Sequence, residues 1–327
     1  MEKNSFKVSV VIPTYKRPIF LLNALQSLDN QSRNDFEVIV VDNASDADIE
    51  NKVRVYARQA KIPIRYFTEP RLGVHYARNL AATLAEGSLL LYTDDDMTFS
   101  PQWISAYIEK FDEHPEMVAA SGPVHPYWEE QPPQWLLDYI GGASVFYLLS
   151  FMKPFNDFQL SRKGFFFSCN MAIKKEVLFL RHGFHPEATG SEWLGDGESG
   201  LNRVMWENGD WIGYIPEALG YHHIPRERMT REYLLKRMEN EGASVEYGYF
   251  NQRQKFDHKS AAIRQARIMM SLSILPIRAV QNLLKGKKFV GLNFSLYAKF
   301  HTSRLRYINR MIKTPEFRDL VLKTGWL

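Results

Sequence analysis

Residues 88–97 read SLLLYTDDDM, an apolar run followed by three consecutive aspartates, Asp94, Asp95 and Asp96. The run is typical of a buried parallel strand, and the carboxyl end of such a strand is where open α/β sheets bind ligands. Adjacent carboxylates repel one another, and a hard divalent cation stabilises them together. A solvated surface loop can carry the same residues, so the run alone leaves a metal site and a plain loop open.

Strand-like and helix-like segments alternate up to the aspartates. The expected strands are 7–12, 36–41, 64–67 and 88–92. The expected helices lie between them, the first marked by leucines at helical spacing from Leu21 to Leu28 and the others covering 46–59 and 74–84. Each strand–helix–strand unit favours a right-handed crossover. The order predicts an α/β fold with a doubly wound, mostly parallel sheet.

The pattern is looser beyond Pro101. It predicts a helix at 102–111, a strand at 117–121 and a loop at 123–133. A β-rich run at 164–173 predicts a further buried strand, which leads into a helix that begins at Lys174.

The composition indicates a globular protein with a substantial core, since 45% of the 327 residues are hydrophobic and 13% are aromatic. Cys169 is the only cysteine, which excludes an intrachain disulfide and fits a reducing compartment. Residues 1–7 lack the apolar stretch of a secretory signal. We therefore expect a cytoplasmic protein.

Positive charge is concentrated in the last part of the chain. Residues 258–327 hold 14 basic and 2 acidic side chains, a net charge of +12, which leaves −8 for residues 1–257. Such asymmetry favours contact with an anionic surface. The apolar stretch 268–284 contains Pro276 and Arg278 and is too short and too polar to span a bilayer. A segment lying on an anionic membrane face and a helical lid with a solvated basic side both remain open.

Four segments, in this order and spacing, resemble family 2 glycosyltransferases of the GT-A fold. They are VSVVIPTYKR (8–17), FEVIVVDNASD (36–46), LGVHYARN (72–79) and YTDDDM (92–97). The resemblance covers residues 7 to about 225. It implies a Rossmann-like GT-A catalytic domain over 1–225, with a nucleotide-sugar half at 1–122 and an acceptor half at 123–225. A basic helical region would follow at 226–327.

The resemblance also implies roles for individual residues. In such enzymes a carboxylate at the position of Asp42 accepts from the imide N–H of uracil, and Mn²⁺ or Mg²⁺ neutralises the departing diphosphate. The metal would be held by Asp94, Asp96 and His222. The residues that would contact the donor are Pro13, Thr14, Tyr15, Arg17, Asp42, Asn43, Ser45, Arg71, Arg78, Asp94, Asp95, Asn170 and Arg228.

A second acidic segment, GSEWLGDGESGLNR (190–203), resembles the family's Glu-Asp motif. In that motif the aspartate deprotonates the acceptor hydroxyl, which then attacks the anomeric carbon from the face opposite the phosphate. This chain departs from the pattern because Gly195 stands where glutamate is common. We expect Asp196 to be the base in preference to Glu198. Asp196 could also cap a helix at 201–207.

Taken with the resemblance, the motifs predict a metal-dependent, inverting transfer of sugar from a UDP-linked donor to a glycan or polyisoprenoid-linked acceptor. The enzyme would be cytoplasmic, with a peripheral position on the cytosolic face of the inner membrane left open, and we do not expect it to bind nucleic acid. A sugar nucleotidyltransferase should carry a glycine-rich loop with Lys or Arg after the first strand, which Pro13-Thr14-Tyr15 matches poorly. A non-catalytic nucleotide-sugar or glycan-binding protein of this fold is the other alternative.

Overall fold

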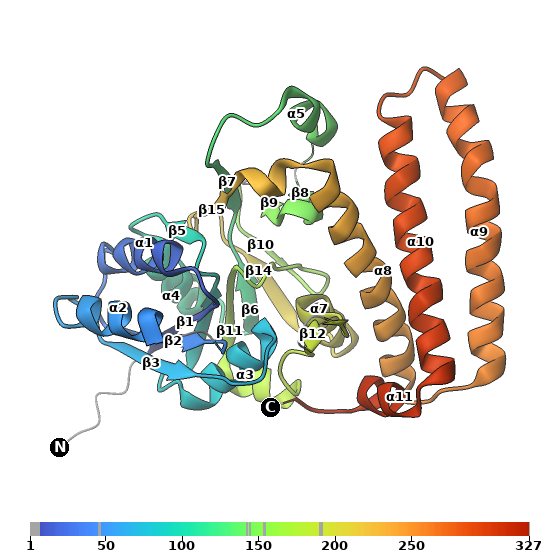
Figure 1. Cartoon of the computed structure of the whole chain (residues 1–327). Coiled ribbons are helices and arrows are strands. Elements are labelled where there is room, and N and C mark those ends of the chain that lie inside the picture. The colour runs from blue at the N-terminus through green and yellow to red at the C-terminus, as the bar shows by residue number, and fades with distance from the viewer. Residues whose placement is uncertain are drawn as a thin grey trace.

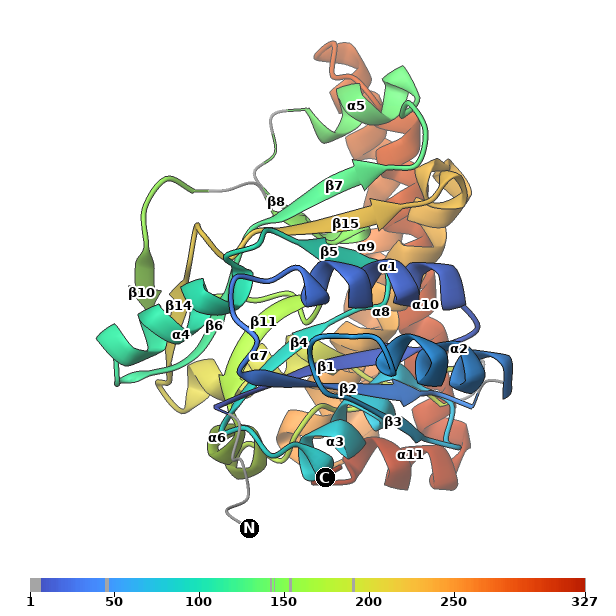
Figure 2. The same ribbon diagram turned by 90° about the vertical axis from the view of Figure 1, so that its left-hand side faces the viewer.

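A computed structural model describes residues 7–44, 47–141, 143, 145–152, 155–189 and 192–326. Its centre is an eight-stranded sheet in the order β10-β14-β6-β11-β4-β1-β2-β3 (Figures 1 and 2). The strands of this sheet are β1 (Val8–Thr14), β2 (Phe36–Asp42), β3 (Ile64–Thr68), β4 (Leu89–Thr93), β6 (Met117–Ser121), β10 (Gln159–Ser161), β11 (Asn170–Lys174) and β14 (Trp211–Tyr214). The parallel-rich sheet confirms the fold class expected from the sequence.

The register of the first strands brings the sequence motifs to one rim. β1 pairs in parallel with β2 from Val8 opposite Phe36 to Thr14 opposite Asp42. β4 pairs in parallel with the other side of β1. The three strands therefore end side by side, and Thr14, Asp42 and the aspartates that follow β4 lie along the carboxyl edge of the sheet.

Helices cover both faces of the sheet, as the continuous apolar strands predict. One face is covered by α1 (Pro18–Asp29), α2 (Ala47–Ala57) and α4 (Trp103–Glu113), and the other by α3 (Val74–Leu84), α6 (Lys175–Leu180) and α7 (Gly197–Glu207). Successive residues of a strand point to opposite faces of the sheet. Val10 therefore packs against the layer of α1, α2 and α4, and Val11 against the layer of α3, α6 and α7.

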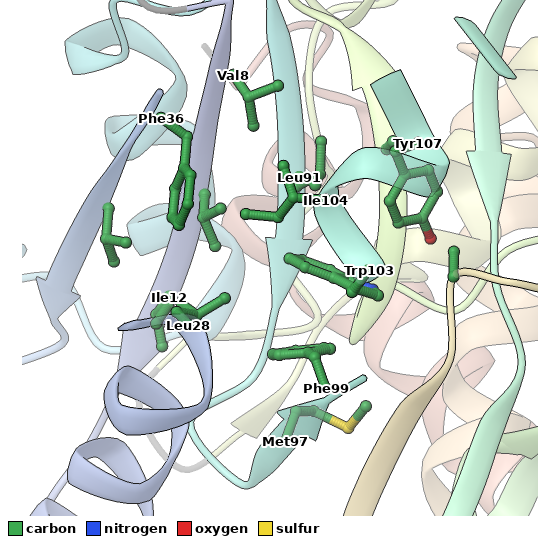
Figure 3. Close-up of a cluster of buried hydrophobic side chains, with 14 of the residues drawn as sticks. Val8, Ile12, Leu28, Phe36, Leu91, Met97, Phe99, Trp103, Ile104 and Tyr107 are labelled. Atoms are coloured by element: carbon green, nitrogen blue, oxygen red, sulfur yellow. The ribbon is translucent and has the colours of Figure 1, made fainter. Parts of the chain in front are cut away.

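Trp103 stands at the centre of the first layer, stacked on Phe99 with ring centroids 4.0 Å apart and surrounded by aliphatic side chains (Figure 3). Its side chain is fully buried. Truncating a core aromatic of this size to Ala destabilises a protein by about 3–5 kcal/mol. This layer therefore fixes α4 against the strands that carry the rim.

A second sheet extends the rim beyond the aspartates. Its order is β5-β15-β7-β9-β8, with β5 (Met97–Phe99), β15 (Gly220–Ile224), β7 (Val124–Trp128), β9 (Phe151–Met152) and β8 (Val145–Phe146). β7 lies inside the segment 123–133, so the loop expected there is wrong. The strand expected at 164–173 is also wrong in extent, because only Asn170–Lys174 pairs with β4 and β6.

The shorter elements link the two sheets to the C-terminal part. They are α5 (Gln134–Ile140), the 3₁₀ turns η1 (Tyr147–Leu149) and η2 (Arg226–Met229), and the hairpin of β12 (Ala188–Thr189) and β13 (Glu192–Trp193).

The C-terminal part is helical, as expected, and consists of α8 (Arg231–Arg253), α9 (His258–Leu284), α10 (Val290–Lys313) and α11 (Pro315–Leu322). α10 packs between α8 and α9, which leaves α9 outermost in the molecule (Figure 1). α9 continues through Pro276, whose ring nitrogen can donate no hydrogen bond. Among the described helices, none combines the length and the hydropathy needed to cross a bilayer.

Candidate active site

A cavity of about 540 Å³ opens at the carboxyl edge of β1, β2 and β4. Its size is that of a small-molecule site, and its position is where ligands bind in open α/β sheets. The lining residues come from segments that lie far apart in the sequence: Pro13, Thr14, Tyr15, Arg17, Asn43, Leu72, Gly73, Val74, Arg78, Asp94, Ser150, Ser168, Glu187, Glu198 and Arg237.

Each aspartate of the run has a cationic partner. Arg17 contacts Asp95 at 2.5 Å and Asp96 at 2.8 Å, while Arg78 contacts Asp94 at 2.5 Å. The hydroxyl of Thr14, at the end of β1, donates to Asp95 Oδ2 at 2.8 Å. The structure thus brings Arg17 together with Thr14 and the aspartates, and the sequence predicts Thr14 and the aspartates at one rim.

Neighbouring charges separate the chemistry of Asp95 and Asp96. Burial raises the pKa of Asp95, and the charge of Asp96 adds to that rise, although Arg17 opposes it. Burial acts in the same direction on Asp96, but His222, Arg17 and Arg228 together hold its pKa well below the ordinary value. Of these two carboxylates, Asp96 is therefore the one whose ionised form is favoured.

The two oxygens of the Asp96 carboxylate have different surroundings. Arg228 contacts its Oδ2 at 3.0 Å, whereas His222 Nε2 lies 3.6 Å from Oδ1. Oδ1 is buried and receives no hydrogen bond within the described part of the chain. The Nδ1 of His222 lies 3.1 Å from the Leu149 carbonyl oxygen. Because a carbonyl oxygen only accepts, this contact favours the tautomer with the proton on Nδ1 and a lone pair on Nε2.

The full ligand set expected from the sequence is not assembled. Across the described ranges, no group of three or more His, Cys, Asp or Glu side chains is arranged to hold a metal ion. Asp94 turns to Arg78, and Arg228 donates to His222 Nε2 at 2.9 Å. Arginines thus neutralise the charge that a bound cation would otherwise balance.

Asp42 and Asn43 lie at the end of β2, as expected, with different surroundings. Asp42 is buried and accepts from the Tyr66 hydroxyl at 2.6 Å. Asn43 lines the cavity and holds the loop before α3, because its Oδ1 accepts from the Gly73 N–H at 2.8 Å and its Nδ2 donates to the Arg71 carbonyl at 2.6 Å. Ser45 lies outside the described residues.

Arg71 is on the rim rather than in the cavity. Its side chain is 61% exposed and pairs with Glu69 at 2.8 Å. The residues that follow it, Leu72 and Gly73, line the cavity instead. Pro13 and Tyr15 line it as expected, and Arg78 reaches it from α3.

Asn170 does not line the donor cavity, which corrects the expectation. It is fully buried at the start of β11, where its Oδ1 accepts from Trp103 Nε1 at 2.7 Å and from the Tyr107 hydroxyl at 2.9 Å. Its Nδ2 donates to the carbonyls of Pro123 and Ala218, both at 2.9 Å. Every hydrogen-bonding position of the amide is used within the core, so Asn170 joins the two sheets.

Asp196 is also displaced from the expected position. It precedes α7, but its carboxylate is buried, contacts Arg203 at 2.7 Å and lies 3.0 Å from His185 Nδ1. It packs against α8, since a Cβ added to Gly248 would lie 3.1 Å from Asp196 Oδ2. Asp196 is not among the described residues that line the cavity. Its side chain makes no capping hydrogen bond to the described part of α7, which starts at Gly197 rather than at 201.

Glu198, two residues further along the chain, faces the cavity. It lies in the first turn of α7, lines the cavity and accepts from the Ser168 N–H at 2.6 Å and from the Ser168 hydroxyl. Burial raises its pKa, and the neighbouring charge of Glu187 raises it further. A carboxylate whose pKa is raised towards neutrality in a cavity is suited to proton transfer.

Glu187 is the second glutamate of the cavity. Its pKa is about 2, because His75, Arg237 and Arg78 outweigh the effect of burial. Arg237 belongs to α8, so the helical C-terminal part supplies a wall of the cavity. The two glutamates therefore differ in character, since Glu187 is a fixed charge whereas Glu198 titrates at higher pH.

Sequence reasoning missed Tyr66, Ser168, Glu187 and Arg237. The register of β2 and β3 places Tyr66 opposite Val40, two residues before Asp42 on the same face, so strand pairing could have found it. Glu187 and Arg237 lie in a loop and on a distant helix, and no local pattern marks them.

The Glycosyl transferase family 2 model matches residues 9–179, which is more than half of the chain. Among curated relatives, a glucosyl-dolichyl phosphate glucuronosyltransferase of Haloferax volcanii is 22% identical over 80% of this chain and 84% of its own length. A validoxylamine A glucosyltransferase of Streptomyces hygroscopicus is 29% identical over 58% of this chain and 49% of its own length.

Solved structures share the fold. A mannosyltransferase of Pyrobaculum calidifontis in complex with GDP-Man and Mn²⁺ superposes with a TM-score of 0.60 at 17% identity, over 92% of this chain and 87% of the other. S. aureus TarS in complex with UDP-GlcNAc has a TM-score of 0.53 at 16% identity, over 93% and 92%. The chain belongs to glycosyl transferase family 2 and is a glycosyltransferase of the GT-A fold.

Proposed function

We propose that the protein transfers a sugar from a UDP-linked donor to a glycan or polyisoprenoid-linked acceptor, with inversion at the anomeric carbon. One observation carries the proposal: a single cavity is lined both by Asp94 of the aspartate run and by Glu198, a carboxylate of raised pKa. Direct displacement needs a diphosphate site and a base at one reaction centre.

The donor occupies the rim formed by β1, β2 and the loop before α3. Asp42, at the end of β2, accepts from the imide N–H of uracil. Arg78 contacts the diphosphate, as a fixed cation that reaches the cavity from α3. UDP is favoured over other nucleotides because a carboxylate suits the uracil donor.

Asp96, with Asp94 and His222, would hold Mn²⁺ or Mg²⁺. The buried Asp96 Oδ1 without a hydrogen-bond donor in the described residues, facing an imidazole nitrogen at 3.6 Å, supports this assignment. The mannosyltransferase of the same fold binds Mn²⁺. A divalent ion there supplies charge neutralisation for the departing nucleoside diphosphate.

Glu198 is the general base in place of Asp196. Its carboxylate takes the proton of the acceptor hydroxyl while the oxygen bonds to the anomeric carbon and the bond from that carbon to the diphosphate breaks. The leaving electrons remain on the nucleoside diphosphate. Asp196 is a positioning residue, which holds the start of α7 through Arg203.

A polyisoprenoid-linked acceptor is favoured by two observations. The Haloferax volcanii relative is named for glucosyl-dolichyl phosphate, and the C-terminal part that supplies Arg237 to the cavity is strongly basic. A glycan acceptor uses the same chemistry at the attacking hydroxyl.

The test is release of nucleoside diphosphate from a panel of UDP-, GDP- and dTDP-sugars, with Mn²⁺ or with EDTA. We expect Mn²⁺-dependent turnover with a UDP-sugar, its loss in Asp96→Asn, and its retention in Asp112→Asn, a matched change at a surface acid of α4. Turnover that neither EDTA nor Asp96→Asn lowers contradicts the proposed site. UDP binding without turnover of any donor favours a binding protein.

A further inference from the structure

α9 carries two apolar stripes on opposite sides. Ala261, Ile268 and Leu275 are buried at seven-residue spacing and face the rest of the molecule. A second set at the same spacing faces outwards: Ile263, Met270, Ile277 and Leu284, exposed by 46, 60, 59 and 83%. Met269, Val280 and Leu283 widen this outer stripe and are 55, 55 and 62% exposed. The outer stripe is thus an exposed apolar face about 30 Å long, from Ile263 to Leu284 at about 1.5 Å per residue.

The charges beside the outer stripe all have one sign. Residues 258–315, which include α9 and α10, contain 12 Lys or Arg and neither Asp nor Glu. Arg267, Arg278 and Lys285 border the stripe on one side along the helix. The turn between α9 and α10 adds Lys287 and Lys288, both exposed. The acids that face this part from α8 are already paired, since Glu246 contacts Arg264 and Arg304.

A groove between α9 and α10 lies at the same end. It measures about 440 Å³ and combines cations with apolar rings, its lining including Arg278, Lys287, Lys288, Phe294, Tyr297 and His301. Acidic side chains are absent from its described lining. Such a groove suits a molecule that has an anionic head and an apolar body.

We propose that the outer stripe and the cations beside it dock the protein on an anionic lipid bilayer, with α9 lying in the plane of the interface. The apolar side chains enter the boundary between headgroups and acyl chains, and the cations contact lipid phosphates. Binding of a second copy of the chain to the stripe is disfavoured by charge repulsion. Two copies would bring their basic residues together with no acid between them to pair. This inference is independent of the chemistry at the cavity.

The test is flotation of the whole protein with vesicles of phosphatidylcholine and phosphatidylglycerol at 7:3, compared with phosphatidylcholine alone. We expect binding to the anionic vesicles and its loss at high salt. Free inorganic phosphate at millimolar concentration should not displace the protein from the vesicles. Displacement by free phosphate would overturn the proposal in favour of a soluble anion at the groove.

Two variants separate the apolar and ionic contributions. Met270→Asp/Ile277→Asp should lower vesicle partition at least about tenfold per residue. Lys285→Ala/Lys287→Ala/Lys288→Ala should lower it about 100-fold, since each cation near an anionic surface strengthens partition about fivefold. The matched controls are Ile19→Asp/Val55→Asp, at apolar residues exposed by 74 and 62% on α1 and α2, and Lys52→Ala/Lys61→Ala/Lys163→Ala. Both controls should bind as the wild type does.

Circular dichroism and thermal melts should show that all variants are folded. Wild-type protein that fails to float with anionic vesicles overturns the proposal, as do stripe variants that float as well as the controls. A wild-type dimer in sedimentation velocity that Met270→Asp/Ile277→Asp dissociates, without vesicle binding, assigns the stripe to a second copy instead.

Discussion

Replacing Glu198 by Gln tests which carboxylate removes the acceptor proton. The change keeps the size and the contact with the Ser168 N–H but removes the base, so kcat should fall by about 10²–10⁴, equivalent to about 3–5 kcal/mol in activation free energy. Because the pKa of Glu198 is raised in the folded state, its ionised form is the less favoured one there. The variant should therefore unfold at a urea concentration no lower than that of the wild type.

Asp196→Asn should behave in the opposite way. It removes a buried charge that contacts Arg203 at 2.7 Å, which should lower the free energy of unfolding by about 3 kcal/mol. Turnover per folded molecule should stay within about tenfold of the wild type, because Asp196 does not reach the reacting atoms. The assay pairs initial rates of nucleoside diphosphate release with urea denaturation and calorimetric UDP binding. Full activity in Glu198→Gln together with loss of turnover in a stably folded Asp196→Asn would refute the reasoning.

Three further changes follow from the same contacts. The pKa of Glu198 is raised, so the acid limb of kcat/KM should lie above pH 4.5 in the wild type. Glu187→Gln removes a like charge and should move this limb to lower pH. An unchanged limb in a pH–rate profile contradicts this expectation. Arg17→Ala removes a counter-charge from Asp95 and Asp96 and should lower the free energy of unfolding by about 3 kcal/mol. Bound Mn²⁺ should restore that stability. Urea melts that Mn²⁺ leaves unchanged count against the metal site. Asn170→Ala loses four hydrogen bonds and should lower the free energy of unfolding by about 3–4 kcal/mol, while donor affinity is unchanged. A specific loss of UDP affinity in the folded variant would mean that Asn170 contacts the donor.

The rim of the sheet was predictable because it depends on local patterns. Apolar runs that end in Thr14, Asp42 and Asp94 are strands of similar length, and parallel pairing in register places their ends together. The order of the motifs therefore fixed both the fold class and the position of the cavity. The register of β2 and β3 could in addition have placed Tyr66 beside Asp42.

The opposite wall of the cavity was not predictable in the same way. Asp196 and Glu198 are two residues apart in a loop–helix junction, and the start of α7 decides which of them faces the cavity. The position of Asp196 also depends on Arg203 and on Gly248 of α8, contacts that sequence spacing does not reveal. Arg237 reaches the cavity from beyond residue 225, where the resemblance to the family ends.

Direct displacement at the cavity with Glu198 as the base predicts inversion at the anomeric carbon. Proton NMR of UDP-α-sugar hydrolysis in Mn²⁺ tests it without knowledge of the acceptor, because the first anomer released reports the stereochemistry before mutarotation. We expect the β-anomer first, with a rate at least about 100-fold lower in Glu198→Gln. Release of the α-anomer first, or an equal rate in Glu198→Gln, would contradict the claim.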